Sequence, residues 1–171
     1  MPPHTARRKT GPRNAASPKM KVGLTATSDY GPKLAPLDQK ARALWAADCA
    51  EHVLRNFEKA RSKDARPREA IAAARQWARG KITMMMARRA AVRAHAAARA
   101  CVHPAAITAA RAAGHAAATA HSIRHAIGAP IYAIMSVAAS AAAENREKAV
   151  SAERKWQLAR LVRRVKLNRS C

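Results

Sequence analysis

The chain has 171 residues, about a quarter of them alanine, and its 33 Lys and Arg against 10 Asp and Glu give a formal net charge of +23. This length suits one domain of ordinary size with a tail. An aromatic content of only 4% argues against a β-sheet fold. The positive charge runs through the whole chain, so it favours polyanionic partners: nucleic acid, an anionic membrane surface or an acidic protein.

Residues 1–36 are basic, rich in proline and without hydrophobic periodicity, so they are predicted to form a disordered tail. Within this stretch, the less polar segment from residue 29 (DYGPKLAPLDQ, 29–39) is expected to lie against the fold. The first residues, MPPHTARRKTG, lack the apolar centre of a secretory signal. The three cysteines, Cys49, Cys101 and Cys171, form no CxxC motif and indicate reduced thiols. Both observations predict a cytoplasmic protein.

The first three helices are predicted from periodicity and from capping residues. The first runs from about residue 38 to residue 60, the second begins at Pro67 and ends at Gly80, and Thr83 caps the third. Their inner faces are expected to be mostly alanine. The expected inner residues are Ala43, Ala46, Ala47, Ala50, Val53, Leu54 and Phe57, then Ala70, Ile71, Ala74, Trp77 and Ala78, then Met84, Ala87, Ala91, Ala94, Ala98 and Cys101.

Pro104 marks another helix start, and residues 112–132 (AAGHAAATAHSIRHAIGAPIY) are predicted to form a central helix. Residues at alternating steps of four and three fall on one line along this helix, and apolar or small residues lie on the opposite side. A helix that is apolar or small on both sides has to be buried. Pro130 is expected to kink it. The residues on the line are Gly114, Ala118, His121, His125, Gly128 and Tyr132, of which Gly114, Ala118 and Gly128 would allow close helix contact.

A last helix, at about residues 144–166, is expected to bury Leu158, Leu161, Val162 and Val165. The patterns together predict an all-α fold: a compact bundle of five to six helices with a buried central helix over residues 37–166, followed by a short end at 167–171. Residues 126–143 are uncharged and just long enough to span a membrane. Nearly half of them are alanine, so no membrane association is expected.

His121 and His125 are the candidate metal ligands, because histidines four residues apart on a helix can chelate a metal. No HExxH motif is present, and the spacing places no third ligand, although His95 or His115 could supply one through tertiary contact. We therefore interpret the pair as structural histidines and expect no metal and no cofactor.

Asp48 and His52 are also four residues apart, beside Trp45, and an acid next to a histidine is the form of a catalytic dyad. The sequence places no Ser, Cys or Thr nucleophile with them. A surface ion pair packed against Trp45 is the simpler interpretation, so no catalytic residue is predicted and the protein is expected not to be an enzyme.

Large and basic side chains supply the remaining candidates. The three tryptophans are expected to fill gaps between helices, and any that is exposed would anchor a partner. The alternative to protein binding is sequence-independent binding of nucleic acid phosphates by the tail and the arginine-rich helix faces. Its candidate residues are Arg7, Arg8, Lys9, Arg13, Lys19, Lys21, Arg89 and Arg93.

Six segments in a fixed order carry a resemblance to a known family: DYGPKLAPLDQ (29–39), LWAADCAEHVL (44–54), RPREAIAAARQWARG (66–80), AHAAARA (94–100), AAGHAAATAHSIRHA (112–126) and ERKWQLARL (153–161). From about residue 24 to residue 161 the chain resembles an alanine-rich, immunity-protein-five-like family of bacterial immunity proteins associated with polymorphic toxin systems.

The resemblance implies an all-α, non-enzymatic protein that binds a cognate protein toxin and silences it by occlusion. The candidate contact residues are Trp45, Asp48, His52, Arg66, Trp77, His95, His115 and Trp156. The chain is more basic than this family leads us to expect, so its charge suits an acidic toxin. The sequence sets no oligomeric state.

Overall fold

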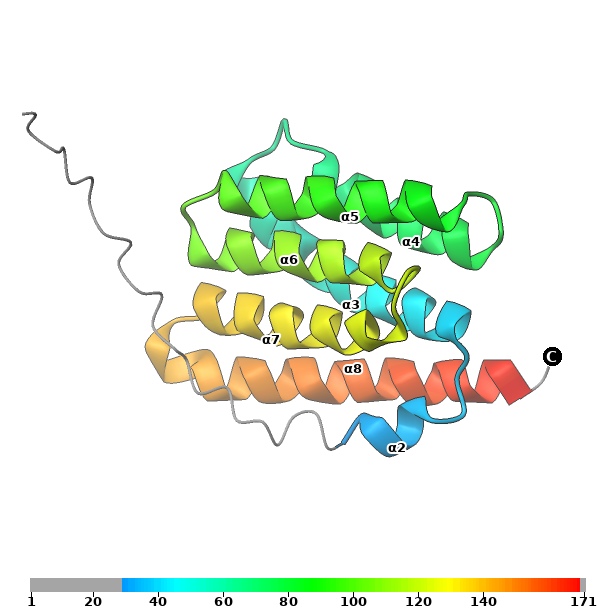
Figure 1. The fold of residues 1–171 in the computed structure, drawn as a ribbon. Helices are drawn as coiled ribbons and strands as arrows, with labels where there is room; N and C mark the ends of the chain where they lie inside the picture. The colour runs from blue at the N-terminus through cyan, green and yellow to red at the C-terminus, as the bar shows by residue number, and fades with distance from the viewer. Residues whose placement is uncertain (1–28, 170–171) are drawn as a thin grey trace, which may run out of the picture.

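The computed structural model describes residues 29–169, and this part of the chain consists of helices joined by short loops and contains no strand (Figure 1). The all-α prediction is confirmed, and residues 29–169 hold seven α-helices where five to six were expected for the bundle. The elements are α2 (Gly31–Leu34), α3 (Gln39–Ala60), α4 (Arg66–Ala78), α5 (Met84–Arg99), α6 (Pro104–Ala118), the 3₁₀ helix η1 (Ile123–Ile127), α7 (Gly128–Ser140), the 3₁₀ helix η2 (Ala143–Asn145) and α8 (Arg146–Arg169).

The residues predicted to begin helices lie at helix N-termini in the structure. The Asp38 carboxylate accepts a hydrogen bond from the backbone N–H of Ala41 at the start of α3. The Thr83 hydroxyl accepts one from Met86 at the start of α5, and prolines lie in the first turns of α4 and α6. After α4, Gly80 has φ 71°, a left-handed conformation that glycine adopts without steric cost.

The prediction of one continuous helix over residues 112–132 is wrong. The helix α6 ends at Ala118, and the chain turns and passes through η1 into α7, which lies beside α6. The Gln39 side chain donates hydrogen bonds to the carbonyls of Thr119 and Ala120, which the end of α6 leaves without helical partners. Pro130 therefore falls in the first turn of α7, where its missing N–H interrupts no helical bond and produces no kink.

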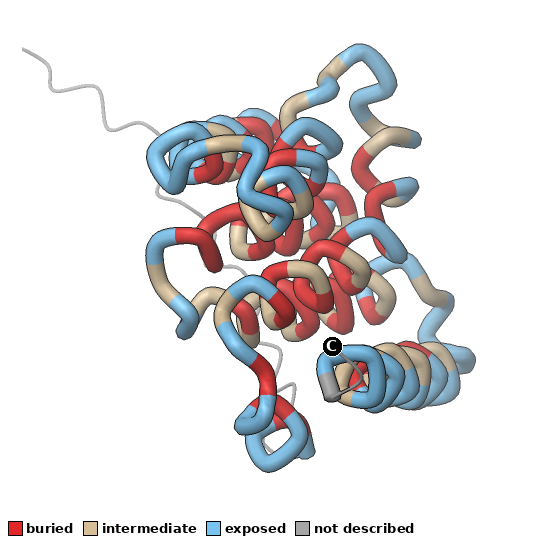
Figure 2. The backbone as a smooth tube through the Cα atoms, turned by 90° about the vertical axis from the view of Figure 1, so that its right-hand side faces the viewer, coloured by how far each residue is buried: buried red, intermediate tan, exposed pale blue. Residues whose placement is uncertain are grey.

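The helices α5, α6, α7 and α8 lie side by side in chain order, and α3 and α4 cover them from behind (Figure 1). The buried central helix is α6, which packs against α3, α5 and α7. Buried residues line the inner sides of the helices (Figure 2), and most of those in the main core are alanine. Such small side chains allow close helix contact but bury little area each.

A second core of larger side chains joins α2, α3 and α8. It contains Tyr30, Leu34 and Leu37 from the N-terminal segment, Trp45 from α3 and Leu161 from α8, all of them buried. The expectation that residues 29–39 lie against the fold is thus confirmed. Residues 1–28, which form most of the predicted tail, and Cys171 lie outside the described residues.

Two predicted inner positions are exposed. Met84 is 40% exposed, because the buried stripe of α5 begins one turn later at Ala87. Val162 is 39% exposed, because α8 lies at the edge of the bundle and buries only one narrow stripe there. On that stripe Glu153 and Gln157 are buried, which the apolar pattern did not predict. In the stretch covered by residues 29–169, every helix is too short or too polar to cross a membrane.

Candidate functional site

A buried polar network ties α8 to the rest of the bundle. The Tyr30 hydroxyl donates a 2.6 Å hydrogen bond to the Gln157 side chain. The Gln157 amide donates to the Glu153 carboxylate at 2.7 Å and to the Pro130 carbonyl at 3.2 Å. The Trp45 indole N–H donates to the backbone carbonyl of Gln157. Trp45 is fully buried, so this predicted contact residue cannot touch a partner in this conformation.

His52 belongs to the outer edge of this network. Its Nδ1 lies 2.7 Å from the Glu153 carboxylate, and its ring stacks on Trp156 with 3.8 Å between ring centroids. The predicted Asp48–His52 ion pair against Trp45 is therefore wrong, and so is the alternative of a catalytic dyad. The acid that holds His52 comes from α8, and the His52 ring packs on Trp156 instead of Trp45. No spacing rule could have found this pair, since Glu153 is 101 residues away.

Asp48 instead lies within an arginine–carboxylate cluster that joins three helices. Its two carboxylate oxygens contact Arg75 of α4 at 3.0 Å and Arg164 of α8 at 2.9 Å, and Arg160 lies 3.8 Å away. Arg75 also binds Glu51. The hydrogen bond from Arg75 lowers the pKa of Glu51. This cluster links α3, α4 and α8, so the position of Asp48 favours a structural role.

Four histidines from neighbouring elements form a second cluster, which we call the histidine cluster: His95 of α5, His115 of α6, His121 of the following turn and His125 of η1. The Nδ1 atoms of His115 and His125 are 3.2 Å apart, and Tyr132 of α7 stacks on His115. The break between α6 and α7 brings His115 and His125 together. In one straight helix these residues, ten positions apart, would lie about 15 Å from each other along the axis.

Glycines make room for these rings. A Cβ atom at Gly114 would lie 2.6 Å from Cε1 of His95, and one at Gly128 would press against His115. Both glycines were expected to allow close helix contact, but imidazole rings occupy the space beside them. Burial lowers the pKa of His115 to about 4 and also lowers those of His95 and His121. These three histidines are therefore mainly neutral at pH 7.

The histidine cluster has the donor atoms but not the geometry of a metal site. Between residues 29 and 169, no group of three or more His, Cys, Asp or Glu side chains is arranged to hold a metal ion. The rings of His121 and His125 are 4.9 Å apart. Nothing in the arrangement supplies a third ligand, and the absence of a metal stays a prediction.

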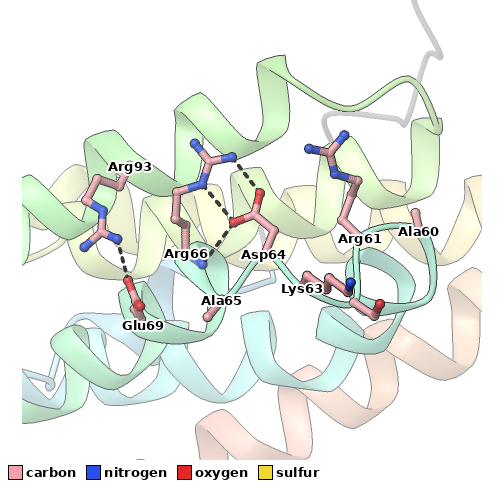
Figure 3. A pocket seen from close by; sticks show the side chains of 9 residues that line it. Ala60, Arg61, Lys63, Asp64, Ala65, Arg66, Glu69 and Arg93 are labelled. Carbon is pink, nitrogen blue, oxygen red and sulfur yellow. Dashed lines mark hydrogen bonds and ion pairs between the residues drawn. The ribbon is translucent and has the colours of Figure 1, made fainter.

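Arg66 lines an open hollow of about 620 Å³ between the α3–α4 loop and α5 (Figure 3). Its guanidinium makes two parallel hydrogen bonds, of 2.8 and 2.6 Å, to the Asp64 carboxylate. These bonds lower the pKa of Asp64. Arg93 reaches the same hollow from α5 and pairs with Glu69 at 3.0 Å. The lining carries more basic than acidic groups: Arg61, Lys63, Arg66 and Arg93 against Asp64 and Glu69.

The outward side of α5 carries exposed apolar residues among arginines. We call this surface the α5 outer face and define it by Met84, Met85, Met86, Arg88, Arg89, Val92 and Arg93. This surface was not predicted, because Met84 was expected to lie in the core. The signal was present, since three consecutive methionines cannot all lie on the inner side of a helix.

The other candidates are distributed over the surface. Trp77 and Trp156 are partly buried, at the end of α4 and in the middle of α8. Arg89 is exposed on the α5 outer face. The tail candidates Arg7, Arg8, Lys9, Arg13, Lys19 and Lys21 lie outside the described residues.

The chain is similar to a described protein family. A family model described as "Imm-5 like putative immunity protein" matches residues 33–164. No curated protein and no solved structure matches the chain. The matched residues run from α2 through most of α8, so they include the histidine cluster, the arginine–carboxylate cluster and the α5 outer face.

Proposed function

This chain belongs to the Imm-5 like putative immunity protein family. From this membership we propose that it binds a partner toxin and neutralises it by covering the toxin's active site or target-binding surface. The observation that carries the proposal is the family match, which spans nearly the whole helical bundle. Occlusion requires no chemistry from this chain, only a surface that keeps its shape.

The internal contacts support a pre-shaped binding surface. The buried network around Gln157 and the cluster around Asp48 each connect helices that are distant in sequence. Polar groups that are paired inside the fold hold the helices in one arrangement, and a rigid surface loses little conformational entropy when it binds. These contacts favour a structural role for Asp48, His52 and Trp45, so the binding surface is to be sought elsewhere.

Co-expression tests the proposal. The full chain is produced in a bacterial host together with the protein encoded by a toxin-like gene adjacent to its own. We expect growth that the toxin alone prevents, and a complex of the two proteins that survives size-exclusion chromatography. Failure to restore growth, with both proteins present in the soluble fraction, would contradict the proposal.

A further inference from the structure

We propose that the α5 outer face is the surface that binds the partner, and that it takes a protein segment whose apolar side chains are flanked by carboxylates. This inference rests on the proposed function in one respect, that the partner is a protein. It adds the location of the contact and the chemistry of the partner's surface.

The apolar part of the α5 outer face has no cover within the fold. Met85 is 46% exposed, Met86 52% and Val92 57%, whereas α5 packs on its neighbours through a stripe of alanines on the opposite side. Neighbouring exposed apolar side chains mark interaction sites more often than scattered ones do. Methionine is flexible and polarizable, so this surface can adapt to the shape of a partner.

In the part of the chain that the structure describes, the positive charge of the α5 outer face is neutralised only at Arg93. Arg88 and Arg89 form no ion pair with any residue between 29 and 169, and Arg93 pairs only with the exposed Glu69. Arg93 also borders the basic hollow at the α3–α4 loop, so positive charge continues from α5 to that loop (Figure 3). Charge complementarity therefore calls for an acidic partner. A second copy of this chain, with its own net charge of +23, would be repelled.

The arrangement of the side chains favours a protein segment over other anions. Met85, Arg89 and Val92 lie at steps of four and three along one ridge of α5, which is the pattern one helix presents to another. A nucleic acid backbone would neutralise the arginines but would leave the methionines in water. A membrane surface would be held by aromatic or leucine anchors, and the α5 sequence MMMARRAAVRAHAAAR contains none.

The test uses the full chain and a defined probe at physiological salt. The probe is a fluorescein-labelled peptide of about 18 residues with leucines at helical spacing on one face and glutamates elsewhere. A second peptide has the same composition in scrambled order. Two variants alter the α5 outer face, Met85→Gln/Val92→Gln and Arg88→Gln/Arg89→Gln. The matched control, Val162→Gln/Leu167→Gln, changes exposed apolar residues of α8.

We expect saturable binding of the amphipathic peptide, measured by fluorescence anisotropy, and weaker binding of the scrambled one. Each double variant of the α5 outer face should weaken binding about tenfold, because two contact residues are lost, and the α8 control should stay within about twofold. The altered side chains are exposed, so melting temperatures should be unchanged. Equal binding by all variants, or equal binding of both peptides, overturns the proposal.

Two further probes separate the other anionic surfaces. Binding to anionic phospholipid vesicles that depends on Met85 and Val92 would overturn the proposal in favour of a membrane. Duplex DNA binding that depends on Arg88 and Arg89 but not on Met85 and Val92, without peptide binding, would overturn it in favour of nucleic acid. The co-expression test remains separate: toxin neutralisation that survives both variants of the α5 outer face refutes this surface but not the immunity function.

Discussion

At the scale of single residues, the size of one side chain decides how its neighbour can pack. The core is mostly alanine, so space for a large ring is made at particular positions, and Gly114 and Gly128 are two of them. A buried polar side chain is likewise tied to its position by its hydrogen bonds. Gln157 is fully buried and forms hydrogen bonds with groups from three other segments. Both kinds of residue can be tested by single substitutions with matched controls.

Gly114→Ala should destabilise the protein by about 1–3 kcal/mol, because the new methyl group would overlap the His95 ring. The sign is informative, since alanine in place of a helical glycine ordinarily stabilises by roughly 0.5–1 kcal/mol. Urea unfolding measures the effect. The control Gly31→Ala, in the first turn of α2, has nothing within 4 Å of the added atom and should be neutral or slightly stabilising. If the ring contact is the cause, His95→Ala in the same chain should recover part of the loss.

Gln157→Leu should cost about 2–4 kcal/mol in the free energy of unfolding, because it leaves the buried Tyr30 hydroxyl without its partner and the buried Glu153 carboxylate with His52 alone. The same replacement at the exposed Gln76 of α4 should change stability by less than about 0.5 kcal/mol. Adding Tyr30→Phe to Gln157→Leu should cost less than the sum of the two single changes. Strict additivity would show that the two side chains are not coupled.

At the scale of helices, sequence reasoning succeeded where a residue acts locally and failed where a contact crosses the fold. Asp38, Thr83 and Pro104 mark helix starts by their own chemistry, and the structure agrees. The turn after Ala118 contains neither Gly nor Pro. The helical spacing of small and apolar residues therefore continues through this turn in the sequence, and nothing in the pattern indicates that the helix ends there. The pairing of His52 with Glu153 depends on how distant helices pack, which no local pattern encodes.

The α6–η1–α7 corner should make stability depend on pH. In the folded protein the pKa of His115 is lowered to about 4 by burial, whereas the unfolded value is near 6.5. The unfolded chain therefore binds more protons, and the stabilisation that is present above pH 6.5 is lost as the pH falls toward 4. His95 and His121 act in the same direction.

Urea unfolding between about pH 5 and pH 7 measures this effect, because carboxylates contribute mainly at lower pH. We expect the free energy of unfolding to fall with decreasing pH in the unaltered protein, and to fall less steeply in a His115→Gln variant. It is the slope that is compared, so a general loss of stability in the variant does not affect the test. Identical slopes would show that His115 is protonated as readily in the fold as outside it.

At the scale of the whole molecule, the charge of +23 dominates its behaviour toward polyanions, whatever its function. Counterion release draws any strongly basic chain to DNA at low salt, so binding there does not identify a role. Residues 1–28 hold six Lys and Arg and no acidic residue. The bundle contacts begin at Tyr30, so residues 1–28 can be removed without deleting any side chain of the second core.

A chain shortened to residues 29–171 should bind duplex DNA more weakly than the full chain at physiological salt, without sequence preference in either case. The loss of six cationic side chains should reduce the slope of log K against log salt by up to about 5. Filter binding or fluorescence anisotropy over a salt series measures both quantities. Neutralisation of the co-expressed toxin should be unaffected, because the proposed contact lies on α5 and the family match begins at residue 33.

The shortened chain also separates the two functions that the charge alone allows. If the arginines of the α5 outer face bind a protein partner, their affinity for DNA is incidental. It should then be independent of base sequence, because arginines that contact only phosphates do not read the bases. Tight, site-specific binding of residues 29–171 to duplex DNA at physiological salt would instead make nucleic acid the partner. It would also reassign Arg89 and Arg93 from contact with a toxin to contact with phosphates.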